Sequence, residues 1–139
     1  MKEMIQEIKK QVEAGMNFIV LSQLSVTANN LIEEVLKRSN KNLDIAYLEF
    51  EKTKEKPFAE AMKKINKKEI DVLIICEGEE CSEKYLNDVQ KQATENKIQL
   101  IFVRKDRKEK NIPVVEINDI ELLLLRDLIT VIPESVLFS

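Results

Sequence analysis

Histidine is absent from this chain of 139 residues, and glycine occurs only twice. The absence of histidine removes the commonest general base and the commonest transition-metal ligand. It also excludes nucleophilic catalysis by a serine triad, because no imidazole is present to activate a hydroxyl group. The scarcity of glycine leaves few positions where a backbone loop can close tightly around a phosphate.

Cysteine is scarce as well, since Cys76 and Cys81 are the only two in the chain. Two cysteines do not make a disulfide framework, and their spacing is not that of a C-x-x-C motif. Cys76 ends an apolar run, and three glutamates lie between the two thiols. We expect reduced, metal-free cysteines around an acidic turn, with a metal or redox site at these thiols as the alternative.

Long apolar runs are also missing. No run approaches the ~20 residues of a membrane-spanning helix. The first turns of the chain carry charges where a signal region would be apolar. We therefore expect a cytoplasmic protein that does not enter a membrane.

Charge of one sign is not in excess, because 22 bases nearly balance 25 acids and the net charge is −3. Without a strongly basic surface, nucleic acid is not expected as a partner. Residues 104–110 are a short basic stretch that includes two acids. We expect this stretch to be a solvated loop, with contact to a phosphate or an acidic partner as the alternative.

Apolar patterns typical of strands and helices alternate along the chain, whose length suits a single domain over residues 1–139. Strands are expected at 18–21, 43–50, 72–75, 100–103 and 114–117, and the runs at 18–21, 72–75 and 100–103 are continuously apolar, as is typical of strands buried on both faces. Helical stripes occur at 2–14, 29–38, 57–65, 82–93 and 118–129, the last with a capping box at Asn118 and Glu121. No helix is expected between the fourth and fifth strands. This order predicts an α/β three-layer sandwich with a mostly parallel five-stranded sheet, Rossmann-like, P-loop-like or flavodoxin-like.

In such a sheet, ligands bind beyond the carboxyl ends of the strands. Residues 22–30 follow the first strand, where a phosphate-binding loop would carry G-x-x-x-x-G-K-[ST]. Ser22 and Thr27 stand at the glycines of that motif, Ala28 at its lysine and Asn29 at its Ser/Thr.

The third strand is similar to the second nucleotide-binding motif, in which four apolar residues precede Asp-Glu. Cys76 replaces the metal-binding aspartate, and Glu77 matches the glutamate that prepares water. In this layout the chain resembles the AAA-type and RecA-like branch of the P-loop NTPases. With the glycines, lysine and aspartate replaced, the resemblance implies a degenerate domain that does not hydrolyse nucleotide. No aspartate ends the first or third strand either, so an active receiver-like domain is not indicated.

The carboxyl ends of the strands nevertheless hold polar residues that could contact a ligand. A small anion could meet the helix N-terminus near Asn29. No catalytic residue, metal ion or cofactor is expected. The candidate ligand-binding residues are Ser22, Gln23, Ser25, Thr27, Asn29 and Glu77.

The last part of the chain is apolar on more than one helical face. Four consecutive leucines occupy positions 122–125, and an apolar stretch follows Pro133. A surface helix needs only one apolar stripe, so a partner surface is indicated, with a tail folded back over the core as the alternative. The candidate partner-binding residues are Leu123, Leu124, Ile132, Leu137 and Phe138.

These observations together favour a non-catalytic protein that acts through contacts with a protein partner or with its own copies. The alternative is a small-molecule or nucleotide-binding domain, or an enzyme whose site lies at the carboxyl ends of the strands.

Overall fold

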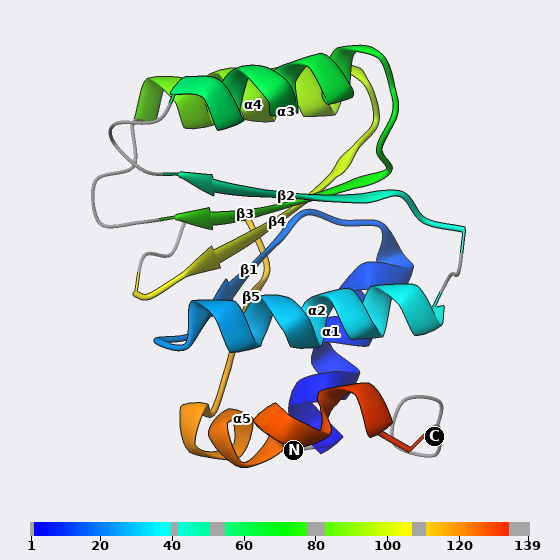
Figure 1. Ribbon diagram of the computed structural model, residues 1–139, viewed down its shortest axis with the longest axis vertical. Helices are drawn as coiled ribbons and strands as arrows, with labels where there is room; N and C mark the ends of the chain where they lie inside the picture. The colour runs from blue at the N-terminus through cyan, green and yellow to red at the C-terminus, as the bar shows by residue number, and fades with distance from the viewer. Residues whose placement is uncertain (1, 40–41, 51–54, 78–82, 107–110, 134–139) are drawn as a thin grey trace.

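The computed structural model describes residues 2–39, 42–50, 55–77, 83–106 and 111–133 (Figure 1). Its helices are α1 (Lys2–Ala14), α2 (Ser25–Ser39), α3 (Glu55–Asn66), α4 (Glu83–Glu95) and α5 (Asp119–Leu125), the last followed by the 3-10 helix η1 (Arg126–Val131). Its strands are β1 (Phe18–Leu21), β2 (Ile45–Phe50), β3 (Val72–Glu77), β4 (Gln99–Arg104) and β5 (Val114–Glu116). The expected α/β class is confirmed.

The five strands form one sheet in the order β2-β3-β4-β1-β5, and every neighbouring pair is parallel. The flavodoxin-like order is 2-1-3-4-5 and the dinucleotide-binding order is 3-2-1-4-5-6, so this sheet has neither of these two expected arrangements. Residues 72–76 of β3 are buried on both faces of the sheet. That burial explains why the strand consists of one continuous apolar run.

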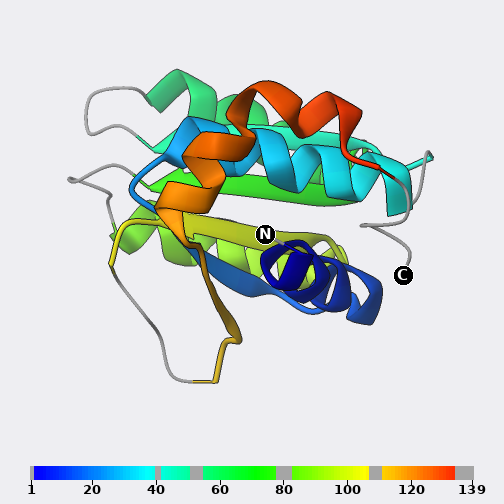
Figure 2. The same ribbon diagram turned by 90° about the horizontal axis from the view of Figure 1, so that it is seen from below.

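Helices cover both faces of the sheet, with α1, α2 and α5 on one side and α3 and α4 on the other (Figures 1 and 2). The right-handed rule for parallel crossovers explains this division. The connection through α2 runs from β1 to the far edge at β2, whereas those through α3 and α4 run back toward β1. Opposite directions place the helices on opposite faces, each over its own apolar core.

Helix α2 begins at Ser25, four residues before the helix expected from position 29. The amide of Ala28 donates to the carbonyl oxygen of Leu24 at 2.8 Å, which closes the first turn. The loop after β1 is therefore only residues 22–24. Such a loop is shorter than the stretch overlaid on the eight-residue phosphate-binding motif.

The chain after β5 folds against α2. Asn118 caps α5, and its side-chain oxygen accepts the amides of Ile120 and Glu121, as the sequence predicts. The regular helix ends at Leu125 instead of continuing to position 129. Arg38 of α2 donates to the carbonyl oxygens of Thr130, at 2.8 Å, and Ile132, which fixes the end of η1.

No helix in the described ranges is long and apolar enough to cross a lipid bilayer.

Candidate functional site

The carboxyl ends of β1 and β4 are where a ligand would be expected in this sheet. The crossovers from these two adjacent strands lead in opposite directions, β1 toward β2 and β4 toward β5. Open α/β sheets bind ligands at such a reversal of strand order. Ser22 follows β1 at this point, and Arg104 ends β4.

Contacts within the chain join these two strand ends. The amide of Ser22 donates to the carbonyl oxygen of Arg104 at 2.9 Å. The side-chain amide of Gln23 donates to the carbonyl oxygen of Lys105 at 3.2 Å. Polar groups that could orient a ligand here are thus bonded across the two strands instead.

The loop after β1 also binds a carboxylate, which belongs to the chain itself. The Ser22 hydroxyl donates to Oδ1 of Asp119 at 2.5 Å, and the Gln23 amide donates to Oδ2 at 3.1 Å. The Leu24 amide in turn donates to the Ser22 hydroxyl at 3.0 Å. Phosphate oxygens bind to the same kinds of donor, amide N–H and hydroxyl groups at the start of a helix. Asp119 is therefore an intrachain anion at the position where a phosphate would be sought.

Glu77 matches the glutamate that prepares water in the P-loop NTPases that the sequence resembles. In this structure the guanidinium group of Arg104 lies beside it. Register places the end of β3 next to the end of β4, and Nε of Arg104 donates to Oε2 of Glu77. The two side chains are only 5% and 2% exposed. The guanidinium carbon of Arg104 lies 4.7 Å from the ring centroid of Phe102, within the range of a cation–π contact. The expectation that residue 104 belongs to a solvated basic loop is wrong, because a buried charge must be paired and Glu77 supplies the partner.

The remaining ligand candidates do not join these two groups. Ser25, Thr27 and Asn29 belong to the first turns of α2. Asn29 is buried, and its Oδ1 has no hydrogen-bond partner among the described residues. Since β4 lies between β1 and β3, Glu77 is two strand spacings, about 10 Å, from the end of β1.

The chain matches no known family model, no curated protein and no solved structure.

Two residues of this candidate site, Arg104 and Asp119, do not follow from the sequence patterns. Arg104 is the first charged residue after an apolar run, and Asp119 is the first after a helix cap. These positions are the only signals in the sequence that could have indicated them. Their partners become evident once β4 lies beside β3 and β5 lies beside β1.

The Cys76 thiol is buried on β3 beneath Tyr47 of β2. Burial raises the pKa of Cys76 to about 11, although a hydrogen bond with Tyr47 partly opposes the shift. Burial, followed by the hydrogen bond to Cys76, likewise raises the pKa of the Tyr47 hydroxyl above its usual value. A thiol with a raised pKa is a poor nucleophile at neutral pH. Cys81 and the rest of the expected acidic turn lie outside the described residues, and within those residues no three acidic or cysteine side chains gather around a metal position.

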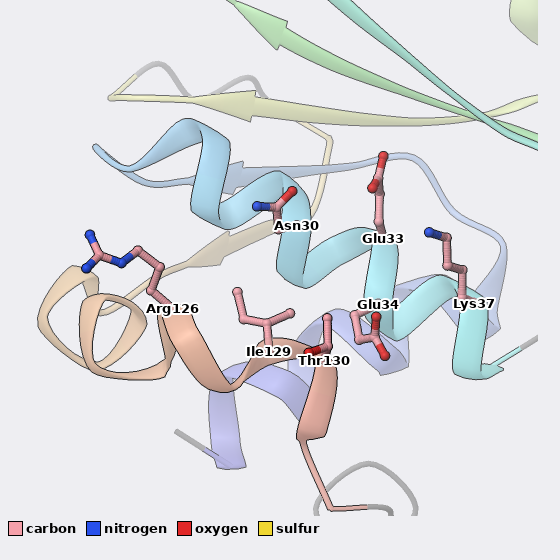
Figure 3. A pocket seen from close by; sticks show the side chains of 7 residues that line it. All are labelled: Asn30, Glu33, Glu34, Lys37, Arg126, Ile129 and Thr130. Atoms are coloured by element: carbon pink, nitrogen blue, oxygen red, sulfur yellow. The ribbon is translucent and has the colours of Figure 1, made fainter.

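A shallow hollow lies between α2 and η1 on the surface of the protein (Figure 3). Arg126 and Lys37 lie at its two ends, with Ile129 and Thr130 between them (Figure 3). Its volume of about 210 Å³ is below the roughly 300–1,000 Å³ of ligand pockets. The hollow is thus too small to hold a cofactor-sized molecule.

The outer face of α5 and η1 is apolar, and we define it by five residues: Ile120, Leu123, Leu124, Leu128 and Val131. Each of them is at least half exposed. Leu123 and Leu124 are thus available to a partner. Ile132 is only 4% exposed, so this candidate belongs to the core instead. Leu137 and Phe138 lie outside the described residues.

Proposed function

We propose that this chain is a non-catalytic protein of the cytoplasm that acts through contacts with other protein chains. The observation that carries the proposal is that Asp119, Arg104 and Glu77, the charged residues of this site, all have partners within the chain. Asp119 accepts the donors of the loop after β1, and Arg104 neutralises Glu77. A nucleotide site needs the opposite arrangement, with donors open to phosphate and a carboxylate open to magnesium or water.

Displacing either partner would be costly. Removing Asp119 from the loop would break two hydrogen bonds to a carboxylate, each worth roughly 1.5–3 kcal/mol. Separating Arg104 from Glu77 would leave two buried charges without their mutual attraction, at about 3–5 kcal/mol. The interactions of an incoming nucleotide with the protein would have to exceed the sum of these two free-energy costs before binding became favourable.

The loop after β1 and the end of β3 are separated in the sheet by β4. We propose a degenerate domain of the P-loop type that the sequence resembles, in which side chains of the chain itself occupy both of these positions.

The outer face of α5 and η1 supports the contact part of the proposal. Five of the eight large apolar side chains that are exposed in the described residues lie on this one segment. Isolated exposed apolar residues are normal, whereas a contiguous group marks a place where another surface packs.

Thermal unfolding with magnesium and ATP or GTP tests the proposal. A nucleotide present at about 100 times its Kd would stabilise the fold by about 2.7 kcal/mol. We expect no increase in Tm at millimolar nucleotide and no phosphate release. Magnesium-dependent hydrolysis that Glu77→Gln abolishes would overturn the proposal.

The variant Asp119→Ala provides the matched control, because it removes the intrachain anion and leaves the loop donors in place. If Asp119 fills an anion site, the variant should gain measurable affinity for inorganic phosphate that the wild type lacks. The wild type binding phosphate as well as the variant does would contradict the argument that the site is filled.

A further inference from the structure

We propose that the outer face of α5 and η1 is the contact surface of a homodimer, in which two copies of this chain pack about a two-fold axis. The inference rests on the proposed function, because it names the protein partner. A second copy of the chain is the proposed partner for three reasons, which concern the rigidity, the area and the charge of this surface.

The surface is held rigidly by the core beneath it. Four residues on the inner side of the segment are buried: Leu122, Leu125, Ile129 and Ile132. Asp119 fixes the start of α5 through Ser22 and Gln23, and Arg38 fixes the end of η1. A surface ordered in advance loses little conformational entropy when a partner binds.

The exposed apolar area matches the requirement of a small dimer. The five residues are 50–75% exposed, which together is on the order of 500–600 Å², the upper end for the largest patch on an ordinary monomer. Two such faces in contact would bury about 1,200 Å², the lower bound for specific and stable interfaces. An isologous contact reaches this area with the surface of one segment from each copy.

The charges at the middle of the segment are self-complementary. Arg126 and Asp127 are adjacent and exposed, and Nε of Arg126 lies 3.6 Å from Oδ1 of Asp127. A two-fold axis through this region would bring the cation of one copy toward the anion of the other. With Glu121 and Asp127 against Arg126, the segment carries no large charge of one sign and does not attract a strongly charged partner such as nucleic acid or an anionic membrane.

Sedimentation equilibrium over a wide range of protein concentration tests the inference. The wild type should approach twice the chain mass of 16.2 kDa at high micromolar concentration. Leu124→Lys and Leu128→Lys should each weaken the dimer by about tenfold or more, because a symmetric contact loses the apolar side chain twice. Both side chains are more than half exposed, so these variants should fold as monomers with unchanged circular dichroism.

Met16→Lys is the matched control, since it replaces another half-exposed apolar side chain, in the α1–β1 turn, and changes the net charge equally. It should leave the dissociation constant unchanged. A wild type that keeps the monomer mass at high micromolar concentration overturns the inference. A dimer that Leu124→Lys and Leu128→Lys weaken no more than Met16→Lys overturns it too. Neither result affects the proposed lack of nucleotide chemistry, which magnesium-dependent turnover alone would overturn.

Discussion

Replacing Arg104 by methionine should destabilise the fold far more than replacing any exposed arginine. Methionine fills similar space with a flexible apolar side chain, but it leaves the carboxylate of Glu77 buried without its cation. Breaking one side of a buried ion pair costs about 3–5 kcal/mol. Domains of this size have a total stability of about 5–15 kcal/mol, so this single change removes a large part of it.

Urea and thermal unfolding, followed by circular dichroism, would measure the effect. For a chain of 139 residues, the loss corresponds to a fall in Tm of roughly 10–20 °C. Arg126→Met is the matched control, because the Arg126 side chain is 59% exposed and its replacement should cost less than about 0.5 kcal/mol.

The double variant Glu77→Met with Arg104→Met separates the pair from its surroundings. An apolar pair of similar volume is often as stable as a buried ion pair or more so. We therefore expect the double variant to be more stable than Arg104→Met alone and close to the wild type. Equal losses in Arg104→Met and Arg126→Met, or a double variant as unstable as the sum of its single changes, would refute the reasoning.

Three further predictions concern other parts of the structure. The free energy of unfolding should fall as the pH rises from 9 toward 11. In this range the Cys76 thiol, whose pKa is raised to about 11 in the fold, stays protonated, whereas the thiol of the unfolded chain ionises. Unfolding of Cys76→Ala, measured at the same pH values, should show a smaller fall. Lys97 lies in the turn after α4 at a φ of 59°, so Lys97→Gly should raise the unfolding free energy by about 0.5–1 kcal/mol, whereas Lys91→Gly inside α4 should lower it by about 1 kcal/mol. Asp119→Asn should lower the free energy of unfolding by about 1–2 kcal/mol through its bonds to the β1 loop, and Asp127→Asn, whose parent side chain is 88% exposed, should leave urea denaturation unchanged.

The strands and most helices could be predicted because burial on both faces of a parallel sheet produces continuous apolar runs. The run at 72–75 lies within β3, which begins at the same residue, and the run at 18–21 coincides with β1. The start of α2 was predicted wrongly for a physical reason. Its first turn carries Ser25, Val26 and Thr27, which have weak helix propensity, so the apolar stripe becomes visible only later.

Half of the candidate site could be predicted in the same way. Ser22, Gln23 and Glu77 are polar residues that directly end or follow buried strands, and they do lie at the carboxyl edge. Their partners could not be predicted, because strand order depends on crossovers between distant segments. Asp119 is 97 residues from Ser22, and Arg104 is 27 residues from Glu77.

The filled strand ends and the exposed apolar face have a common structural origin in Asp119. This residue supplies the anion for the loop after β1, and it is also the first residue of α5. Because its carboxylate is bonded on both oxygens, α5 leaves the sheet in one fixed direction and turns its outer leucines toward solvent. A nucleotide at the ends of β1 and β4 would compete for the same donors and release the start of α5. In the proposed function, the arrangement that would exclude a nucleotide is therefore also the one that holds the outer face of α5 and η1 in place.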